Sequence, residues 1–274
     1  MPGKPNVDAA EKYLVPGLER GLRLLSEFSH DEPQLSAAEL ARRLEVPRST
    51  VFRLLVTLET LGYVERAGRD YQLGMGVLRL GFEYLASLDL AVLGQPLLDS
   101  LRDETSFACN MVMRDGRWVV YVAKSAARTP FASSVTVGTR LPAHATVFGR
   151  VLMQDLSLPA LRRLYPEPRL KSHSARTPAT VAALFDLLKQ DQQRGTVMEE
   201  GFFEPNISTI AAPVRDQSGR VQAALGITVP ASTLDDKQRE DLLRRVSQAA
   251  LELSGKLGRD VSGAGASLHS LQAK

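Results

Sequence analysis

The sequence predicts an α+β chain in which a winged helix-turn-helix is joined by a linking helix to a larger α/β domain. Three observations predict it. Two amphipathic segments meet at a tight turn within residues 36–61, two short β-prone runs follow at residues 63–73, and β-prone and helical segments alternate after residue 105. We place an N-terminal extension at residues 1–15, the winged helix-turn-helix at 16–75, the linking helix at 76–90, the second domain at 91–257, and a small polar tail, expected to be disordered, at 258–274.

The composition is that of an ordinary globular protein. The 274 residues are 44% hydrophobic and 24% charged, which excludes a chain that is disordered throughout. The only cysteine is Cys109, so an internal disulfide and a Cys-cluster zinc site are both excluded. No apolar run approaches the ~18 residues of a membrane span. Residues 1–16 also lack the apolar stretch of a signal peptide. We therefore expect a cytoplasmic protein with no membrane partner.

The first 62 residues contain signals for three helices. Residues 15–28 carry Leu18, Leu22 and Leu25 at helical spacing, which predicts one apolar face. Ser36 and Glu39 have the spacing of a capping box and open a second, short helix. A tight turn at residues 45–46 precedes a third helix that begins at residue 47 and ends near residue 61.

The third helix has one apolar face and one face suited to DNA. Its predicted buried stripe is Val51, Leu54, Leu55, Leu58 and Leu61. The opposite face mixes an aromatic ring, hydroxyls and arginine, a combination that fits the major groove, where arginine reads guanine and apolar groups meet thymine methyls. The hairpin at residues 63–66 and 70–73 forms the wing. The predicted DNA-binding residues are Arg42, Arg48, Ser49, Thr50, Phe52 and Arg53, with Arg66 and Arg69 in the wing.

Local charge supports this interpretation better than total charge does. The net charge of +3 on 274 residues is weak evidence for a nucleic-acid partner, and residues 1–75 sum to −1. Residues 42–53 alone carry +3, concentrated beside the third helix. The alternative is that these arginines merely solvate a helical module that binds proteins.

The second half alternates strands and helices. Asp115 and Gly116 predict a type I′ hairpin between two of the strands. The predicted strands are residues 109–113, 118–123, 131–137, 207–214 and 220–229. The predicted helices are residues 76–87, 91–105, 144–153, 177–194 and 235–257. Free N–H groups at residues 145–148, at the start of one helix, are suited to a carboxylate.

Several segments together resemble the IclR family of bacterial transcriptional regulators. They are GLERGLRLL at residues 17–25, LARRL at 40–44, PRSTVFRLL at 47–55, GYV at 62–64, YQLG at 71–74, GTRLPAHAT at 138–146, IAAPV at 210–214 and PAS at 230–232. Their order and spacing make the resemblance specific over residues 16–257. It implies a GAF-like α/β effector-binding domain, a homodimer or tetramer, and a repressor or activator controlled by a small molecule.

The resemblance also indicates an effector site. Carried over by position, the effector-binding residues are Val147, Phe148, Glu199, Thr209, Gly226 and Thr228. Many relatives have small residues at positions 147 and 148, cysteine at 209, and serine at 226 and 228. We expect Val147 and Phe148 to reshape the mouth of the cavity or to shield its ligand, and Gly226 to open space in it. Core packing explains Val147, Phe148 and Thr209 individually about as well as ligand binding does.

The sequence gives little support to an enzyme. It contains no Gly-x-Ser-x-Gly elbow, phosphate loop or His-Glu-x-x-His motif, so we predict no catalytic residue, no metal ligand and no cofactor. Cys109 begins an apolar strand and is expected to be a core residue. His144, in an apolar, proline-flanked stretch, is expected to be a structural histidine that hydrogen-bonds to backbone.

These observations predict a regulator that binds double-stranded operator DNA and responds to a small organic acid, aromatic acids included. We expect the acid to favour one arrangement of paired subunits, with the linking helix resetting the spacing of the two recognition helices. One alternative is a sensor domain that acts through protein partners. A degenerate enzyme in the second domain is the least favoured. The sequence does not identify the effector or the operator.

Overall fold

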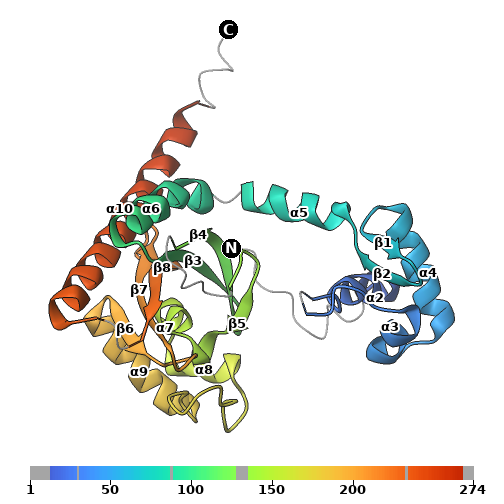
Figure 1. The fold of residues 1–274 in the computed structure, drawn as a ribbon, viewed down its shortest axis with the longest axis horizontal. Coiled ribbons are helices and arrows are strands. Elements are labelled where there is room, and N and C mark those ends of the chain that lie inside the picture. Colours follow the sequence, from blue (N-terminus) through green and yellow to red (C-terminus); the bar gives the residue numbers. More distant parts are fainter. Residues whose placement is uncertain (1–12, 30, 87–88, 128–134, 232–233, 268–274) are drawn as a thin grey trace. The chain divides into compact units, whose positions relative to one another are not determined.

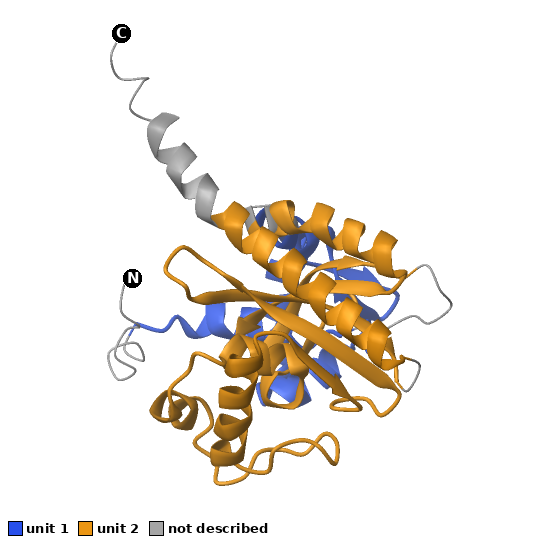
Figure 2. Cartoon of the chain, turned by 90° about the vertical axis from the view of Figure 1, so that its left-hand side faces the viewer, with its two compact units in different colours: residues 1–87 blue, residues 88–274 orange. Residues whose placement is uncertain are grey.

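A computed structural model describes residues 13–29, 31–86, 89–127, 135–231 and 234–267. The chain divides into two compact units, Met1–Ser87 and Leu88–Lys274 (Figure 2). The units are described separately. No helix in these described ranges is long and apolar enough to cross a membrane.

The first unit is a winged helix-turn-helix. Its elements are α2 (Pro16–Leu25), α3 (Ala37–Leu44), α4 (Arg48–Thr60), β1 (Val64–Ala67), β2 (Asp70–Leu73) and α5 (Met75–Ala86) (Figure 1). Strands β1 and β2 pair antiparallel to form the wing. The predicted order of helices, turn and hairpin is confirmed. The predicted linking helix corresponds to α5, which ends at residue 86.

Local hydrogen bonds set the helix boundaries in this unit. The Ser36 hydroxyl accepts from the Glu39 N–H at 3.1 Å, which is the first half of the predicted capping box. The second half is absent, because the Glu39 carboxylate accepts from Arg42 and Arg43 instead. Glu45 takes the left-handed conformation, with φ of 56°, and its N–H satisfies carbonyls at the end of α3. This conformation makes the tight turn that joins α3 to α4.

The core of the first unit is small and differs in part from the prediction. Val51 and Leu55 of the predicted α4 stripe are fully buried, and Leu54 and Leu58 are half-buried. Leu61 is exposed, because it follows the last turn of α4 and lies outside the core. In the predicted α2 stripe, Leu18 and Leu22 are also exposed and Leu25 is half-buried, whereas α2 buries Gly21 and Leu24. The other buried members of this core are Phe28, Leu35, Leu40, Ala41, Leu44, Val64 and Tyr71.

The second unit is built on one antiparallel sheet of six strands in the order β5-β4-β3-β8-β7-β6. The strands are β3 (Ala108–Asp115), β4 (Trp118–Ser125), β5 (Arg140–Pro142), β6 (Val197–Glu200), β7 (Ile207–Arg215) and β8 (Val221–Pro230). The helices are α6 (Asp89–Thr105), η1 (Ala143–Ala145), α7 (Val147–Met153), α8 (Leu158–Leu164), α9 (Val181–Arg194) and α10 (Asp236–Ser267).

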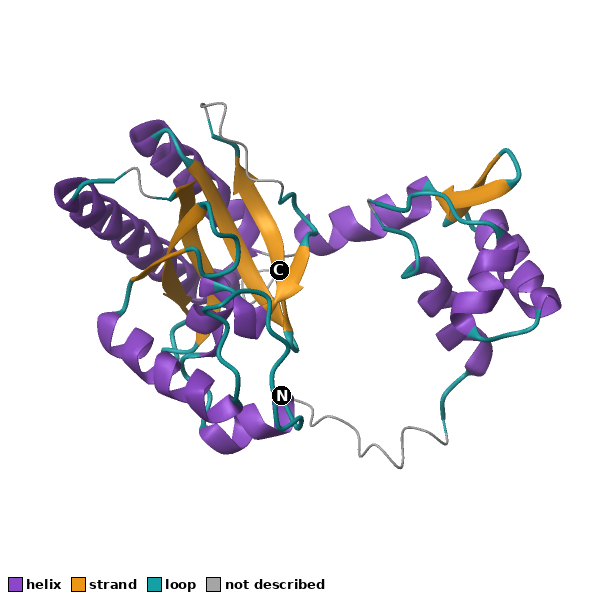
Figure 3. Cartoon of the chain, turned by 60° about the horizontal axis from the view of Figure 1, so that its bottom comes forward, coloured by secondary structure: helices purple, strands orange, loops and turns teal. Residues whose placement is uncertain are grey.

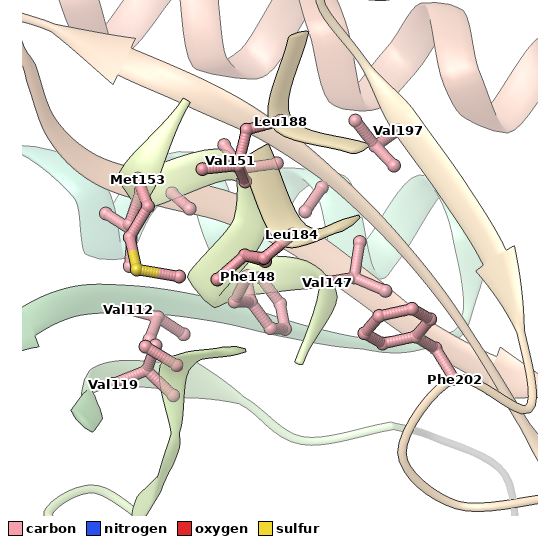
Figure 4. Packing of buried hydrophobic residues seen from close by; sticks show 14 of the residues in the cluster. Val112, Val119, Val147, Phe148, Val151, Met153, Leu184, Leu188, Val197 and Phe202 are labelled. Atoms are coloured by element: carbon pink, nitrogen blue, oxygen red, sulfur yellow. The ribbon is translucent and has the colours of Figure 1, made fainter. Parts of the chain in front are cut away.

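The sheet lies between two helical layers. Helices α6 and α10 pack on one face, and α7, with α9 beyond it, covers the other (Figure 3). Alternation along the strands divides the side chains between these layers. Met111 is close to Gly94 of α6, whereas Val112 belongs to the cluster that contains Val147 and Phe148 of α7 (Figure 4). This arrangement confirms the predicted α+β class.

Several boundaries in the second unit correct the sequence interpretation. The β3–β4 turn lies at residues 116–117, one residue later than predicted, with Gly116 at φ of 58°. The predicted helix at 144–153 is divided because Thr146 takes an extended conformation between η1 and α7. The helix predicted from residue 177 begins at Val181, where the Thr180 hydroxyl caps it.

Other elements were missed or misplaced. The strands β5 and β6 and the helix α8 were not predicted, because segments of three to seven residues carry little periodic signal. Of the strand predicted at 131–137, residues 131–134 lie outside the described residues and 135–137 are not extended in the sheet. Helix α10 continues past residue 257 to Ser267, so Gly258 does not end it as predicted; no proline interrupts it.

Candidate functional site

The outer face of α4 presents the predicted DNA-reading residues to solvent. Arg48, Ser49, Phe52 and Arg53 are exposed, and Thr50 is half-buried. The Phe52 side chain is 54% exposed although it is aromatic. A solvated helix face gains nothing from such a ring, whereas a groove of stacked bases and thymine methyls provides it with contacts.

The predicted DNA-binding arginines fall into two groups. Arg42 and Arg43 both hydrogen-bond to Glu39, and Arg43 also pairs with Glu32 at 2.8 Å. The +3 counted over residues 42–53 is therefore partly neutralised by acids on α3 and before it. In the wing, the Arg66 guanidinium contacts Glu59 at 3.2 Å and also lies 5.2 Å from the Tyr71 ring centroid.

The second group has no such partners. Arg48, Arg53 and Arg69 are exposed, and their guanidinium groups make no ion pair or hydrogen bond with any residue in the described ranges. Unpaired guanidinium groups retain all their N–H donors for an external acceptor. Among the predicted DNA contacts, these three arginines are therefore the cations that are best prepared to meet an anionic partner.

An apolar groove lies on the same unit, between α2, α4 and the middle of α5. Its volume is about 490 Å³. Leu18 and Leu22, 62% and 58% exposed, form part of its wall. The remaining lining residues include Gly17, Gly21, Leu25, Leu54, Leu58, Leu61, Tyr63 and Leu80. An exposed apolar surface of this kind is typical of a contact site for another macromolecule.

The second unit contains a small cavity between α7 and the sheet, which we call the effector cavity. Its volume is about 40 Å³, close to the space of one water molecule in the liquid. Four of the six predicted effector residues line it: Val147, Phe148, Thr209 and Thr228. Tyr121, Phe203 and Glu204 also line it and were missed, since no sequence motif connects strand β4 or the 201–206 loop to this site.

Phe148 is the reason that the cavity is so small. Its ring is almost fully buried and lies edge-on to Tyr121, with 5.8 Å between the ring centroids. A Cβ added to Gly226 would lie 2.9 Å from the Phe148 ring and 2.1 Å from the Ile210 carbonyl oxygen. The space that we expected Gly226 to open is thus filled by Phe148, and Gly226 itself does not line the cavity.

Glu199, the remaining predicted residue, faces a charged network instead. Its carboxylate contacts Arg150 at 3.2 Å, with Arg176 and Arg194 at 3.6 and 3.9 Å. Arg150 is 1% exposed and also makes two hydrogen bonds to the buried Asp191. Because removing one partner would leave a buried charge uncompensated, this network fixes α7 against α9 and β6.

The Arg150 network also reaches the loop that closes the cavity. The guanidinium carbon of Arg150 lies 4.6 Å from the Phe202 ring centroid, and the Ser174 hydroxyl donates to the Phe202 carbonyl. The next residue, Phe203, lines the cavity. The wall of the cavity is thus held by contacts outside it.

Hydroxyl groups supply much of the polar lining of the cavity. Thr228 accepts a hydrogen bond from the Asn110 amide at 3.3 Å, and Thr146 caps α7 by accepting from the Gly149 N–H. Burial, with the nearby Glu204 carboxylate, raises the pKa of Tyr121, which therefore stays protonated. Among the lining residues that the structure describes, none is lysine, arginine or histidine.

Cys109 and His144 contribute to the packing and hydrogen bonding of the second unit. Burial raises the pKa of the Cys109 thiol to about 12, so it remains protonated and unreactive at neutral pH, and the prediction of a core residue is confirmed. The His144 Nε2 lies 2.8 Å from the Lys171 carbonyl oxygen, which confirms the predicted backbone contact. No cluster of three or more potential metal ligands occurs within the described ranges.

Comparison with known proteins assigns both units. Residues 17–68 match the family model described as the IclR helix-turn-helix domain, and residues 82–255 match that of the bacterial transcriptional regulator IclR C-terminal domain. The Pca regulon regulatory protein of Pseudomonas putida is 36% identical over 212 residues, which cover 77% of this chain and 73% of that protein. The regulator XynR of Escherichia coli K12 is 28% identical over 247 residues, covering 89% and 98%.

Solved structures agree in fold. An IclR transcriptional regulator of Alicyclobacillus acidocaldarius superposes with a TM-score of 0.80 and 25% identity, covering 90% of this chain and all of the other. An IclR homologue of Microbacterium hydrocarbonoxydans, solved in complex with 4-hydroxybenzoate, has a TM-score of 0.77 and 23% identity, covering 88% and 98%. The two family matches together span both units, and the chain belongs to the IclR family of bacterial transcriptional regulators.

Proposed function

We propose that this protein is a ligand-responsive transcriptional regulator that binds operator DNA through α4 and the wing. Its proposed ligand is a small organic acid, with aromatic acids as the first candidates, bound in the effector cavity. The observation that carries the DNA-binding part is the exposed face of α4, where Phe52 lies beside two unpaired arginines.

Each predicted DNA contact has a separate physical role in this proposal. Arg53, near the middle of the exposed face, reads a base edge, and Phe52 meets a thymine methyl. Arg48, Ser49 and Thr50 lie at the helix N-terminus, where donors and the helix dipole favour a phosphate. The wing arginines contact the flanking backbone. Arg42 and Arg66 take part only if DNA phosphates displace the half-buried carboxylates Glu39 and Glu59, with which these exposed arginines pair.

We infer that the active form is a homodimer, or a tetramer built from such dimers. The exposed leucines of the α2–α4 groove support a second copy of the chain as its occupant, because burying them removes a large apolar surface from water. A dimer also presents two recognition helices to successive turns of DNA, about 34–36 Å apart. Paired sites strengthen binding without any additional contact per subunit.

The proposed effector must open the cavity in order to enter. An apolar cavity of roughly 150 Å³ holds benzene, and the present space is about 40 Å³. A turn of Phe148 away from Gly226 provides the extra room. The relative solved with 4-hydroxybenzoate makes that acid a suitable first probe. Tyr121, Thr209 and Thr228 supply hydroxyl groups for its oxygen atoms.

The regulatory step is a shift in population between two arrangements of the subunits. A ligand that binds one arrangement more tightly favours it by the difference in affinity. Helix α5, at the end of the DNA-binding unit, transmits the change to the spacing of the paired α4 helices. A small change in spacing removes one of the two contacts with the DNA and weakens binding.

Selection from random-sequence DNA tests the proposed DNA binding. The full-length protein is expected to enrich one two-fold symmetric sequence and to bind it far more tightly than a scrambled duplex. A result in which no sequence is enriched, while the helical unit captures a protein, favours the alternative of a sensor that acts through protein partners.

A thermal-shift screen of small carboxylates tests the effector class. An acid that binds only the folded protein raises the melting temperature in a concentration-dependent way. Stabilisation by 4-hydroxybenzoate or a related acid supports the proposal. Stabilisation by neutral compounds alone contradicts the assignment of an organic acid.

A further inference from the structure

A buried amide beneath the effector cavity has an unused hydrogen-bonding atom. Asn110 lies in the central strand β3 and is fully buried. Its Nδ2 donates to the Thr228 hydroxyl oxygen at 3.3 Å. Its Oδ1 is shielded from solvent and has no hydrogen-bond partner among the described residues. A buried acceptor without a donor destabilises the folded state, so its presence requires a reason.

The sheet register places this amide next to the residue that Phe148 covers. Asn110 is directly opposite Gly226 in the β3–β8 pair, and directly opposed residues project from the same face of a sheet. Thr228, two residues from Gly226, lies on that face too and lines the cavity. The Phe148 ring occupies the space above Gly226. Asn110 therefore lies on the cavity face of the sheet, opposite the glycine that the Phe148 ring covers and hydrogen-bonded to Thr228, which lines the cavity.

We propose that Asn110, Gly226 and Thr228 form a cryptic subsite that receives a hydroxyl group of the effector once Phe148 turns away. The ligand O–H donates to Asn110 Oδ1, which is the acceptor that the closed cavity leaves unused. The room comes from the Phe148 ring, which lies close over Gly226, within 2.9 Å of where a Cβ at that position would be, and vacates that space when it turns. The proposal rests on the proposed function and narrows the effector to a hydroxy-substituted organic acid.

The subsite explains why the protein keeps a buried, unpaired acceptor at Asn110 although such an atom destabilises the folded state. An apolar residue at position 110 would satisfy the packing of this face without burying an unpaired acceptor. A site that hydrogen-bonds a ligand hydroxyl rejects analogues that lack it, since the buried partner is then left unpaired. Asn110 thereby lowers the stability of the ligand-free protein and raises its selectivity for a ligand with a hydroxyl group.

Calorimetric titration of the full-length protein with 4-hydroxybenzoate and 4-fluorobenzoate tests the proposal. Fluorine is close to a hydroxyl in size but donates no hydrogen bond. The wild-type protein is expected to bind the hydroxy acid at least about tenfold more tightly. In Asn110→Leu, the two acids are expected to bind within about twofold of each other, and the melting temperature without ligand is expected to stay the same or rise.

Gln154→Leu provides a matched control. Gln154, at the end of α7, is also buried, and neither polar atom of its amide has a partner among the described residues. It does not line the effector cavity. This variant is expected to keep the wild-type selectivity between the two acids, so a loss confined to Asn110→Leu reports the subsite and not the removal of a buried amide in general.

Three outcomes overturn the proposal, and they separate it from the proposed function. Equal binding of both acids by the wild-type protein, a result that does not depend on any variant folding, removes the subsite and leaves an organic-acid effector in place. Unchanged selectivity in Asn110→Leu likewise removes Asn110 from recognition. Binding of neither acid contradicts the aromatic-acid effector and the subsite together.

Discussion

The two units of the chain differ in where they have groups without interaction partners. The winged helix-turn-helix leaves its unsatisfied groups on the outside, where leucines line an open groove and exposed arginines, among them Arg48, Arg53 and Arg69, have no ionic partner in the described residues. The second unit leaves its unsatisfied groups inside. Asn110 Oδ1, His144 Nδ1 and Arg150 Nη1 are buried there without a hydrogen-bond partner among the described residues.

This difference indicates what each unit binds. Exposed apolar and cationic groups are completed by large partners that approach from outside, here a second subunit and DNA. Buried polar groups are completed only by a molecule small enough to enter, after a side chain such as Phe148 has moved. The exposed apolar and cationic groups therefore indicate binding of a second subunit and of DNA. The buried polar groups indicate which small molecules the protein selects.

A charge in the apolar groove is expected to produce the largest effect. In Leu22→Asp, a carboxylate replaces one of the groove leucines, and its desolvation opposes docking of a second copy. The variant is expected to be monomeric in analytical ultracentrifugation and to lose about 100-fold or more in operator affinity, the advantage that paired binding provides. Leu251→Asp, at an exposed leucine of α10 outside the groove, is the control. A dimeric Leu22→Asp protein would remove the groove from the interface.

Gly226→Ala tests how closely the interior is packed. The added Cβ would lie 2.1 Å from the Ile210 carbonyl oxygen, which belongs to the neighbouring strand and has little freedom to move. The free energy of unfolding is expected to fall by roughly 1–3 kcal/mol or more, as measured by denaturant titration. Gly255→Ala, where a Cβ meets open space in α10, is expected to be neutral or slightly stabilising. Equal stability of Gly226→Ala and Gly255→Ala would contradict the close approach of the Ile210 carbonyl oxygen to position 226.

Removal of Arg53 tests the exposed face of α4. Arg53→Ala is expected to weaken specific DNA binding by roughly 1–3 kcal/mol if the guanidinium reads a base. An electrophoretic mobility shift titration measures this change. Arg163→Ala, at an exposed arginine of α8 in the second unit, removes the same charge and is expected to leave the affinity unchanged. Equal operator affinity of Arg53→Ala and wild type would exclude Arg53 from base reading.

A smaller effect, on the stability of α3, is expected when the pH is lowered. Hydrogen bonds from Arg42 and Arg43 hold the pKa of Glu39 at about 2, below the ordinary 4.5. The folded state thus prefers the ionised carboxylate, and the stability that this provides above pH 4.5 is lost as the pH falls toward 2. The protection of α3 amides against hydrogen exchange, relative to the intrinsic exchange rate at each pH, is expected to fall over that range in the wild type and less so in Glu39→Gln. Glu45→Gln is the control, and an identical pH profile for Glu39→Gln and wild type would contradict the assignment.

Much of the first unit was predictable because its signals are local. A capping serine, a turn and a short hairpin each depend on neighbours within a few residues, and all three occur where expected. The sequence does not predict whether the α2 leucines are buried in the core of this chain or exposed. Helical spacing shows that Leu18 and Leu22 share a face, and the same pattern arises whether that face meets this chain or another one.

The charge pattern shows a similar limit. The spacing of Glu39 from Arg42 and Arg43 permits ion pairs along the helix, yet the sequence does not rank those pairs against contacts with DNA. Only the structure separates the paired arginines from Arg48 and Arg53. The residues expected to contact DNA are still a prediction.

The effector cavity was predictable in part. Family resemblance located Val147, Phe148, Thr209 and Thr228, all of which line it. The contact between Phe148 and Gly226 joins positions 78 residues apart in the sequence and depends on the packing of α7 over the β8 strand. For the same reason, no sequence pattern pointed to Asn110, whose proposed role depends on its register with Gly226.

The central claim is that occupancy of the effector cavity changes the affinity for DNA. Its most direct test is fluorescence anisotropy titration of the selected operator duplex with and without saturating 4-hydroxybenzoate, using wild type and Thr209→Val. The wild-type affinity is expected to change by roughly 5–150-fold, the usual range of allosteric coupling. Thr209→Val is expected to keep the ligand-free affinity and to lose most of that response. An organic acid that binds the wild-type cavity while leaving operator affinity unchanged would contradict the account.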